Sequence, residues 1–171
     1  MFVVIRGGGD IATGIALRLY RSGMAVCLCE IPAPTAIRRT VCFSEAVRLG
    51  ETTVEGITAR CCHMEEVPDL LEQGMIPVLI DPAGESIPAL APDVVVDAIL
   101  AKRNLGTTMD MAPVVIGVGP GFTAGEDCHA AVETMRGHYL GRVPYEGSPL
   151  ENTAVPGLIG GNAGERVLRA P

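Results

Sequence analysis

Short runs of apolar, mostly β-branched residues alternate along the chain with glycine-rich turns and with segments whose apolar residues recur at helical spacing. The runs predict strands covered on both faces, at residues 2–5, 25–29, 54–59, 77–81, 94–97 and 114–118. The helical spacing predicts helices at residues 10–21, 44–49, 65–72 and 126–136. This alternation predicts an α/β fold, with a Rossmann-like, mainly parallel sheet and helices on both faces.

The distribution of glycine and proline divides the chain into two parts. Residues 1–146 hold all the predicted strands and helices, and we expect them to form one Rossmann-like domain. In residues 147–171, glycine and proline recur with no period that would support a helix or a strand. We expect this part to be a Gly-rich linker leading toward a C-terminal module that is absent from the sequence.

Composition narrows the class of protein. Hydrophobic residues make up 48% of the 171 residues and charged residues 19%, which excludes intrinsic disorder and leaves a homo-oligomer open. The formal net charge of −7 argues against a nucleic-acid partner. We expect no membrane segment, because no apolar run reaches about 20 residues, and a cytoplasmic location, because the N-terminus lacks a basic leader. The six cysteines show no metal-ligand spacing, so reduced thiols and no metal site are predicted.

A glycine-rich turn joins the first predicted strand to the first helix in a G-x-G-x-x-A pattern. Such a turn lets a phosphate approach the backbone at a helix N-terminus. An acidic residue ends the next strand, where a carboxylate can accept hydrogen bonds from a ribose. The candidate positions are Gly7, Gly8, Gly9, Asp10, Ala12 and Glu30. The alternative is that the glycines only permit close packing, and the charge of Asp10 opposes a phosphate unless its side chain caps the helix.

A second glycine-rich loop, residues 117–125, follows the last predicted strand. Its backbone N–H groups are candidates for an anion site, with Gly119, Gly121 and Thr123 as the contributing residues. Because the carboxyl ends of parallel strands meet at one edge of a sheet, we expect both glycine loops to flank one cleft. The alternative is an ordinary long turn.

Charged residues near these strand ends are further candidates. Asp97 ends a predicted strand and Lys102 follows it, while Arg38 and Arg39 follow a proline-rich loop close to Glu30. The cations would neutralise a phosphate or a carboxylate. A solvated loop explains the same residues without a ligand.

Several of these segments, taken together, resemble a known family. The segments are residues 6–14, 30–32, 35–40, 96–102, 119–122 and 133–138. They are similar to the YqeB-type accessory proteins of selenium-dependent molybdenum hydroxylase systems, which are related in fold to XdhC-type molybdenum-cofactor chaperones. The resemblance extends over the whole chain.

The resemblance implies a role in maturing a selenium-dependent molybdenum hydroxylase, which would then be the partner protein. It also implies a phosphate-bearing ligand, either the molybdenum cofactor (molybdopterin) or NAD(P) or another nucleotide. No catalytic residue is assigned, and whether the protein is an enzyme stays open. Two alternatives remain, an NAD(P)-dependent oxidoreductase and a non-catalytic interaction protein.

Overall fold

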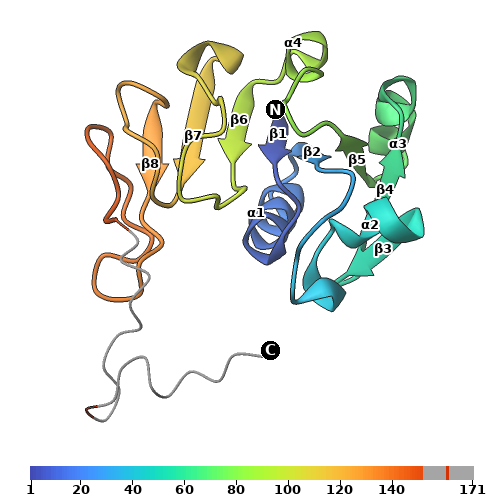
Figure 1. Ribbon diagram of the computed structural model, residues 1–171. Helices are drawn as coiled ribbons and strands as arrows, with labels where there is room; N and C mark the ends of the chain where they lie inside the picture. The colour runs from blue at the N-terminus through green and yellow to red at the C-terminus, as the bar shows by residue number, and fades with distance from the viewer. Residues whose placement is uncertain (152–160, 162–171) are drawn as a thin grey trace.

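A single eight-stranded sheet forms the centre of the computed structural model, which describes residues 1–151 and residue 161 (Figure 1). The strand order is β3-β4-β5-β2-β1-β6-β7-β8, and only β3 is antiparallel to its neighbour. The strands are β1 (Phe2–Arg6), β2 (Ala25–Glu30), β3 (Glu51–Val54), β4 (Ile57–Cys62), β5 (Ile76–Ile80), β6 (Val94–Asp97), β7 (Val114–Val118) and β8 (Ala130–Val132). The prediction of an α/β fold with a mainly parallel sheet is confirmed.

The helices are short except for the first. They are α1 (Asp10–Arg21), α2 (Glu45–Leu49), α3 (Val67–Glu72) and α4 (Ile87–Leu90), with single 3-10 turns η1 (Arg39–Val41), η2 (Met64–Glu66) and η3 (Met109–Met111). In α1, an acidic residue lies in the first turn and Arg18 and Arg21 in the last, which complements the helix dipole. Gly23, at φ +82°, follows its end. None of the helices in the described part of the chain is long and apolar enough to cross a bilayer.

Side chains from successive strand positions enter two separate cores on the two faces of the sheet. Val3 and Ile5 pack with Ala16 of α1 on one face. Val4 packs with Val67 of α3 on the other face, where Ile87 of α4 also lies. Because side chains alternate across a strand, a continuous apolar run fills both cores. Helices therefore cover both faces of the sheet.

Two sequence predictions about single elements are wrong. Residues 54–59 are not one strand: the chain reverses at Glu55 and Gly56, both at positive φ, and forms the β3–β4 hairpin. Residues 126–136 are not helical. They form a turn and then β8, because the backbone N–H of His129 donates to the carbonyl of Val115 (2.8 Å) and β8 pairs with β7. Pairing to an existing sheet edge overrides the local helical pattern.

The first residues of the predicted linker contact the sheet domain. Gly147 pairs with Ala124, and the N–H of Leu150 donates to Glu133 Oε2 at 2.7 Å. The rest of the predicted linker, residues 152–160 and 162–171, lies outside the described residues.

The glycines of the loop after β7 permit close packing. A Cβ on Gly117 would overlap the ring of Phe122, which is buried against the sheet. A Cβ on Gly121 would lie 2.5 Å from Cα and N of Arg103, so the two backbones are in direct contact. Gly125 also has a positive φ, but a Cβ there would meet nothing within 4 Å.

This difference predicts unequal effects of two alanine substitutions. Both Gly121→Ala and Gly125→Ala introduce a side chain at positive φ, and only Gly121→Ala forces a backbone apart. We expect Gly121→Ala to lower the free energy of unfolding by about 1–3 kcal/mol more than Gly125→Ala, as measured by urea denaturation. Equal effects would contradict the packing described here.

Candidate functional site

A cavity of about 520 Å³ opens at the carboxyl ends of β1, β2, β5 and β6. Its lining includes the last residue of β2, Glu30, and the residues directly after the other three strands, Gly7, Asp81 and Ala98. The strands that follow β1 in the chain, β2 and β5, extend the sheet from one edge of β1, whereas β6 pairs with its other edge. Ligands of open parallel sheets bind where the strand order reverses in this way. The cavity therefore lies where open parallel sheets typically bind their ligands.

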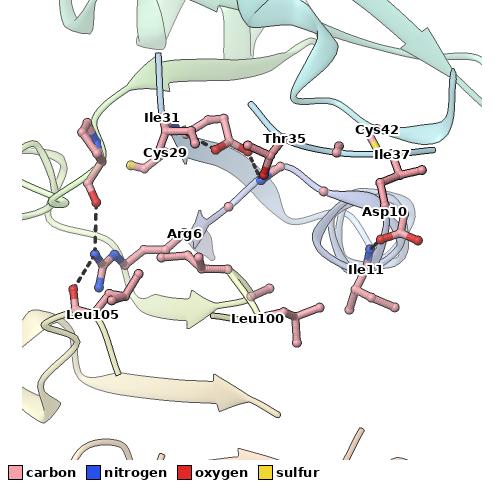
Figure 2. A pocket seen from close by; sticks show the side chains of 18 of the residues that line it. Arg6, Asp10, Ile11, Cys29, Ile31, Thr35, Ile37, Cys42, Leu100 and Leu105 are labelled. Atoms are coloured by element: carbon pink, nitrogen blue, oxygen red, sulfur yellow. Dashed lines mark hydrogen bonds between the residues drawn. The ribbon is translucent and has the colours of Figure 1, made fainter. Parts of the chain in front are cut away.

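One wall of the cavity is built on a buried guanidinium. Arg6 is 1% exposed, and its Nη1 lies 3.3 Å from Oδ2 of Asp97 and also donates to the hydroxyl of Thr107. Its Nη2 donates to backbone carbonyl oxygens after β5 and β6, those of Pro82 (3.3 Å), Ala83 (3.4 Å) and Leu105 (3.1 Å). In Figure 2, Arg6 lies toward Leu105, on the side away from α1. Arg6 thus holds two loops against the end of β1.

The three glycines of the turn after β1 have different roles. A Cβ on Gly7, at φ +98°, would lie 3.0 Å from the carbonyl oxygen of Ala98, and a Cβ on Gly8 would lie 3.0 Å from the backbone N of Ser44. Both therefore permit close packing. A Cβ on Gly9 would meet nothing within 4 Å, and Gly9 lines the cavity. Gly9 is thus the position at which a ligand has room to approach the backbone.

The N-terminus of α1 has unused donors. Among the described residues, no acceptor is bonded to the backbone N–H of Gly9 or Asp10, and both residues line the cavity. Ala12, a predicted site residue, is buried against the sheet and lies outside the lining. Asp10 turns back onto the helix, and its Oδ1 accepts the N–H of Ile11 at 3.0 Å (Figure 2). Its Oδ2 pairs with Arg38, whose Nε lies at 2.6 Å. The charge of Asp10 is therefore balanced by a cation at the cavity.

The segment between β2 and η1 covers one side of the cavity. Thr35, Ile37 and Arg38 line the cavity, and Ile37 is 96% exposed. Within the described chain, residues 32–37 form no hydrogen bond to the rest of the protein. The Arg38–Asp10 ion pair is thus the polar side-chain contact that holds this segment over α1.

Glu30 lies beside the glycine turn. Its Oε2 accepts the N–H of Gly8 and its Oε1 accepts the N–H of Ile31, both at 2.7 Å. Each carboxylate oxygen can accept further hydrogen bonds. The carboxylate therefore orders the turn and still offers acceptors to a ligand in the cavity.

Several predicted site residues lie outside the lining of this cavity. Asp97 is buried beneath it, bonded to Arg6 and Thr107. Arg39 pairs with Glu45 at 2.8 Å, and Lys102 is exposed on the loop after β6. The residues of the second glycine loop, Gly119, Gly121 and Thr123, do not line the cavity either.

The second glycine loop starts at the same edge of the sheet as the first, because β7 is parallel to β6 and β1. Two of its predicted anion-binding residues use their N–H groups within the protein: that of Gly119 donates to the carbonyl of Val132, and that of Thr123 donates to Asp127. The hydroxyl of Thr123 lies 3.1 Å from that of Ser148. This loop packs against the β7–β8 side of the sheet and does not line the cavity.

Sequence reasoning missed Arg6. The signal for Arg6 was a charged residue at the end of an apolar strand, directly before the glycines. Asp81 also follows an apolar run and precedes a proline, a pattern typical of the start of a turn, and the structure shows that it orders a loop. Asp81 accepts the N–H groups of Gly84, Glu85 and Ser86 and the hydroxyl of Ser86 at 2.6–2.9 Å. Burial alone raises the pKa of Asp81, but these hydrogen bonds outweigh it and lower the pKa.

The cysteines are free thiols. Burial raises the pKa of Cys29, which lines the cavity, to about 12, and the pKa of Cys62 to about 11. Both are therefore protonated at neutral pH and are poor nucleophiles.

In the described part of the chain, no group of three His, Cys, Asp or Glu side chains could hold a metal ion. Cys62 and His63 line a separate hollow at the ends of β4 and β5.

Removing the buried guanidinium is expected to destabilise the fold strongly. Arg6→Met leaves the Asp97 carboxylate buried without its cation, and we expect the free energy of unfolding to fall by about 3–5 kcal/mol. Arg21→Met is the matched control, because Arg21 forms an exposed ion pair with Glu55, and should cost less than about 1 kcal/mol. Urea denaturation measures both, and similar losses would contradict the role given to Arg6.

Asp81 predicts a pH-dependent contribution to stability. Because its pKa is lowered in the folded state, its contribution is present above the unfolded pKa, near 3.8, and is lost as pH falls through the folded value. Asp81→Asn should therefore cost about 1–3 kcal/mol at pH 7 and much less at pH 3. Glu72→Gln, on the exposed end of α3, should change the free energy of unfolding by less than about 0.5 kcal/mol at either pH. A loss for Asp81→Asn that is the same at both pH values would refute this assignment.

Comparison with known proteins agrees with the similarity expected from the motifs. No protein-family model matches the chain, and no solved structure matches it. The chain is 59% identical over 170 residues to a protein of Escherichia coli (strain K12) named "Uncharacterized protein YqeB". The match covers 99% of this chain and 31% of that protein, so the chain spans less than a third of the length of this relative. The chain is thus similar, over nearly all of its residues, to one part of a YqeB protein.

Proposed function

We propose that this protein binds a phosphate-bearing small molecule in the cavity at the ends of β1, β2, β5 and β6. The observation that carries the proposal is the start of α1. There the N–H groups of Gly9 and Asp10 have no acceptor among the described residues, and Gly9 leaves open space in front of them. Unpaired N–H groups at a helix N-terminus bind anions, and the helix dipole favours negative charge there.

The strand order supports a Rossmann-like interpretation of the sheet. From β5 to β8 the order β5-β2-β1-β6-β7-β8 corresponds to the 3-2-1-4-5-6 order of dinucleotide-binding sheets. The hairpin strands β3 and β4 extend it beyond β5. In such sheets the phosphate binds at the first helix, and an acidic residue at the end of the second strand binds the ribose. Gly9 and Glu30 occupy these two places here.

The side chains at the cavity suit both candidate ligands, a nucleotide and molybdopterin. The ligand phosphate would accept from the N–H groups at the start of α1. Arg38, at the same end of the helix, would then contact the phosphate as well as Asp10. Glu30 would accept from a ribose hydroxyl or from a pterin N–H. The cavity thus offers donors to the phosphate and acceptors to the rest of the ligand.

We place this binding activity in the maturation of a selenium-dependent molybdenum hydroxylase, in the cytoplasm. This part of the proposal rests on the sequence segments that resemble YqeB-type accessory proteins. The protein would hold a phosphate-bearing cofactor or nucleotide while the hydroxylase is assembled. Mass spectrometry of the small molecules that copurify with the protein from a cell that makes such a hydroxylase tests it directly.

Exposed apolar side chains support a second candidate, a docking role without a ligand. Tyr139, Leu140 and Tyr145 follow β8 and are 57%, 58% and 73% exposed. Such side chains are typical of surfaces that contact another protein or a second copy. Size-exclusion chromatography of the protein with and without the hydroxylase separates a heteromeric complex from a homo-oligomer.

The proposal predicts a specific effect of substitution at Gly9. Gly9 has φ −65°, and its Cβ position is open, so Gly9→Val should fold normally and place its side chain in front of the N–H donors. We expect at least a tenfold loss of ADP or pyrophosphate affinity in isothermal titration calorimetry, about 1.4 kcal/mol.

The matched control is Gly14→Ala, on the exposed side of α1. It should raise the free energy of unfolding by about 0.5–1 kcal/mol, because alanine favours the helix, and leave the affinity unchanged. If Gly9→Val bound these ligands as tightly as the unsubstituted protein, the site at α1 would be refuted.

A further inference from the structure

The cavity ends at β6 and does not continue along the sheet. Its lining comes from residues at the ends of β5, β2, β1 and β6, together with the segment after β2. The loop after β6, residues 98–107, lies on its β7 side. There Arg103 contacts Gly121 through the backbone, and Cδ2 of Leu100 would lie 3.1 Å from a Cβ on Gly119. The loop therefore closes the space between the cavity and the second glycine loop.

Several hydrogen bonds hold this loop in place. Asp97 accepts the N–H of Ile99 at 3.1 Å and the hydroxyl of Thr107 at 2.6 Å, and Arg6 binds the carbonyl of Leu105. Asn104 bonds both the N–H and the carbonyl of Thr107, at 2.7 and 2.8 Å. These contacts fix both ends of the loop to the buried Arg6–Asp97 pair.

The backbone of the loop is strained between these anchors. Leu100 and Lys102 have φ values of +60° and +62°, in the left-handed region that is unfavourable for residues with a side chain. Such strain persists only where the surrounding structure enforces it, and it is concentrated at ligand sites and switches. The closed position of the loop is thus imposed by the fold.

We infer that the site accepts a ligand of one nucleotide and excludes a second nucleotide; this inference rests on the proposed phosphate-binding function. In dinucleotide-binding sheets of this order, the ligand crosses the point of reversal and places its second nucleotide over the other half of the sheet. Here that half begins at β6, and the loop of residues 98–107 fills the space between the cavity and that half. The nucleotide half that Gly9 and Glu30 serve remains accessible.

Leu100 is the specificity-determining residue of this arrangement. It lines the cavity and also contacts the second glycine loop, so its side chain forms the end wall. Leu105 lines the cavity too and is 41% exposed. Substituting each leucine therefore compares the end wall, formed by Leu100, with the exposed rim, where Leu105 lies.

The experiment compares ADP with NAD⁺ by isothermal titration calorimetry. We expect ADP to bind the protein at least tenfold more tightly than NAD⁺. Leu100→Ala should raise the affinity for NAD⁺ relative to that for ADP by at least threefold, because it shortens the wall. Leu105→Ala should leave the ratio of the two affinities unchanged.

NAD⁺ binding that is as tight as ADP binding in the unsubstituted protein would overturn the inference and leave the proposed function standing. An affinity ratio that Leu100→Ala and Leu105→Ala change equally would overturn the role of Leu100. Binding of neither ligand would overturn the inference alone. ADP or pyrophosphate binding that Gly9→Val does not weaken would overturn the proposed function and the inference together.

Discussion

The structure around the cavity depends on the burial of one ion pair between neighbouring strands. Arg6 and Asp97 are the last residues of β1 and β6 and lie in register. Taking both charges out of water is costly unless every polar atom finds a partner. The carbonyl oxygens and the hydroxyl that serve as partners come from the loops after β5 and β6. Satisfying the buried pair therefore determines the conformation of both loops, and so the floor and one wall of the cavity.

The opposite wall follows a different physical rule. At the start of α1 the charges of Asp10 and Arg38 remain near solvent, where an ion pair is weak and exchange of partners costs little. The segment carrying Arg38 forms few contacts, and the exposed side chain of Ile37 lies on it. A ligand anion can therefore compete for Arg38 without disturbing the core. The cavity thus combines a rigid wall, made by buried charges, with an adaptable one, made by exposed charges.

The glycines illustrate how one residue type serves both packing and binding. Gly7, Gly117 and Gly121 allow backbone or ring atoms to approach at distances that a Cβ would forbid, whereas Gly9 faces open space. A glycine-rich pattern in the sequence carries no information about which of these it is, because the difference lies in what another part of the chain places opposite it. For this reason the first glycine turn lies at a cavity and the second lies in a packed loop.

The sequence by itself determined the class of fold, because continuous apolar runs can be buried only in strands covered on both faces. It also determined α1, β1, β2, β5, β6 and β7, whose patterns are local, and the acidic residue at the end of β2. Tertiary structure alone decided that residues 126–136 form β8 instead of a helix, since pairing with β7 outweighs helical propensity there. It also decided that Arg6 and Asp97 form the base of the site, and that Arg39, Lys102 and the second glycine loop lie outside its lining. These outcomes depend on contacts between residues far apart in the chain, and no local pattern specifies which partner a charged side chain or a glycine will meet.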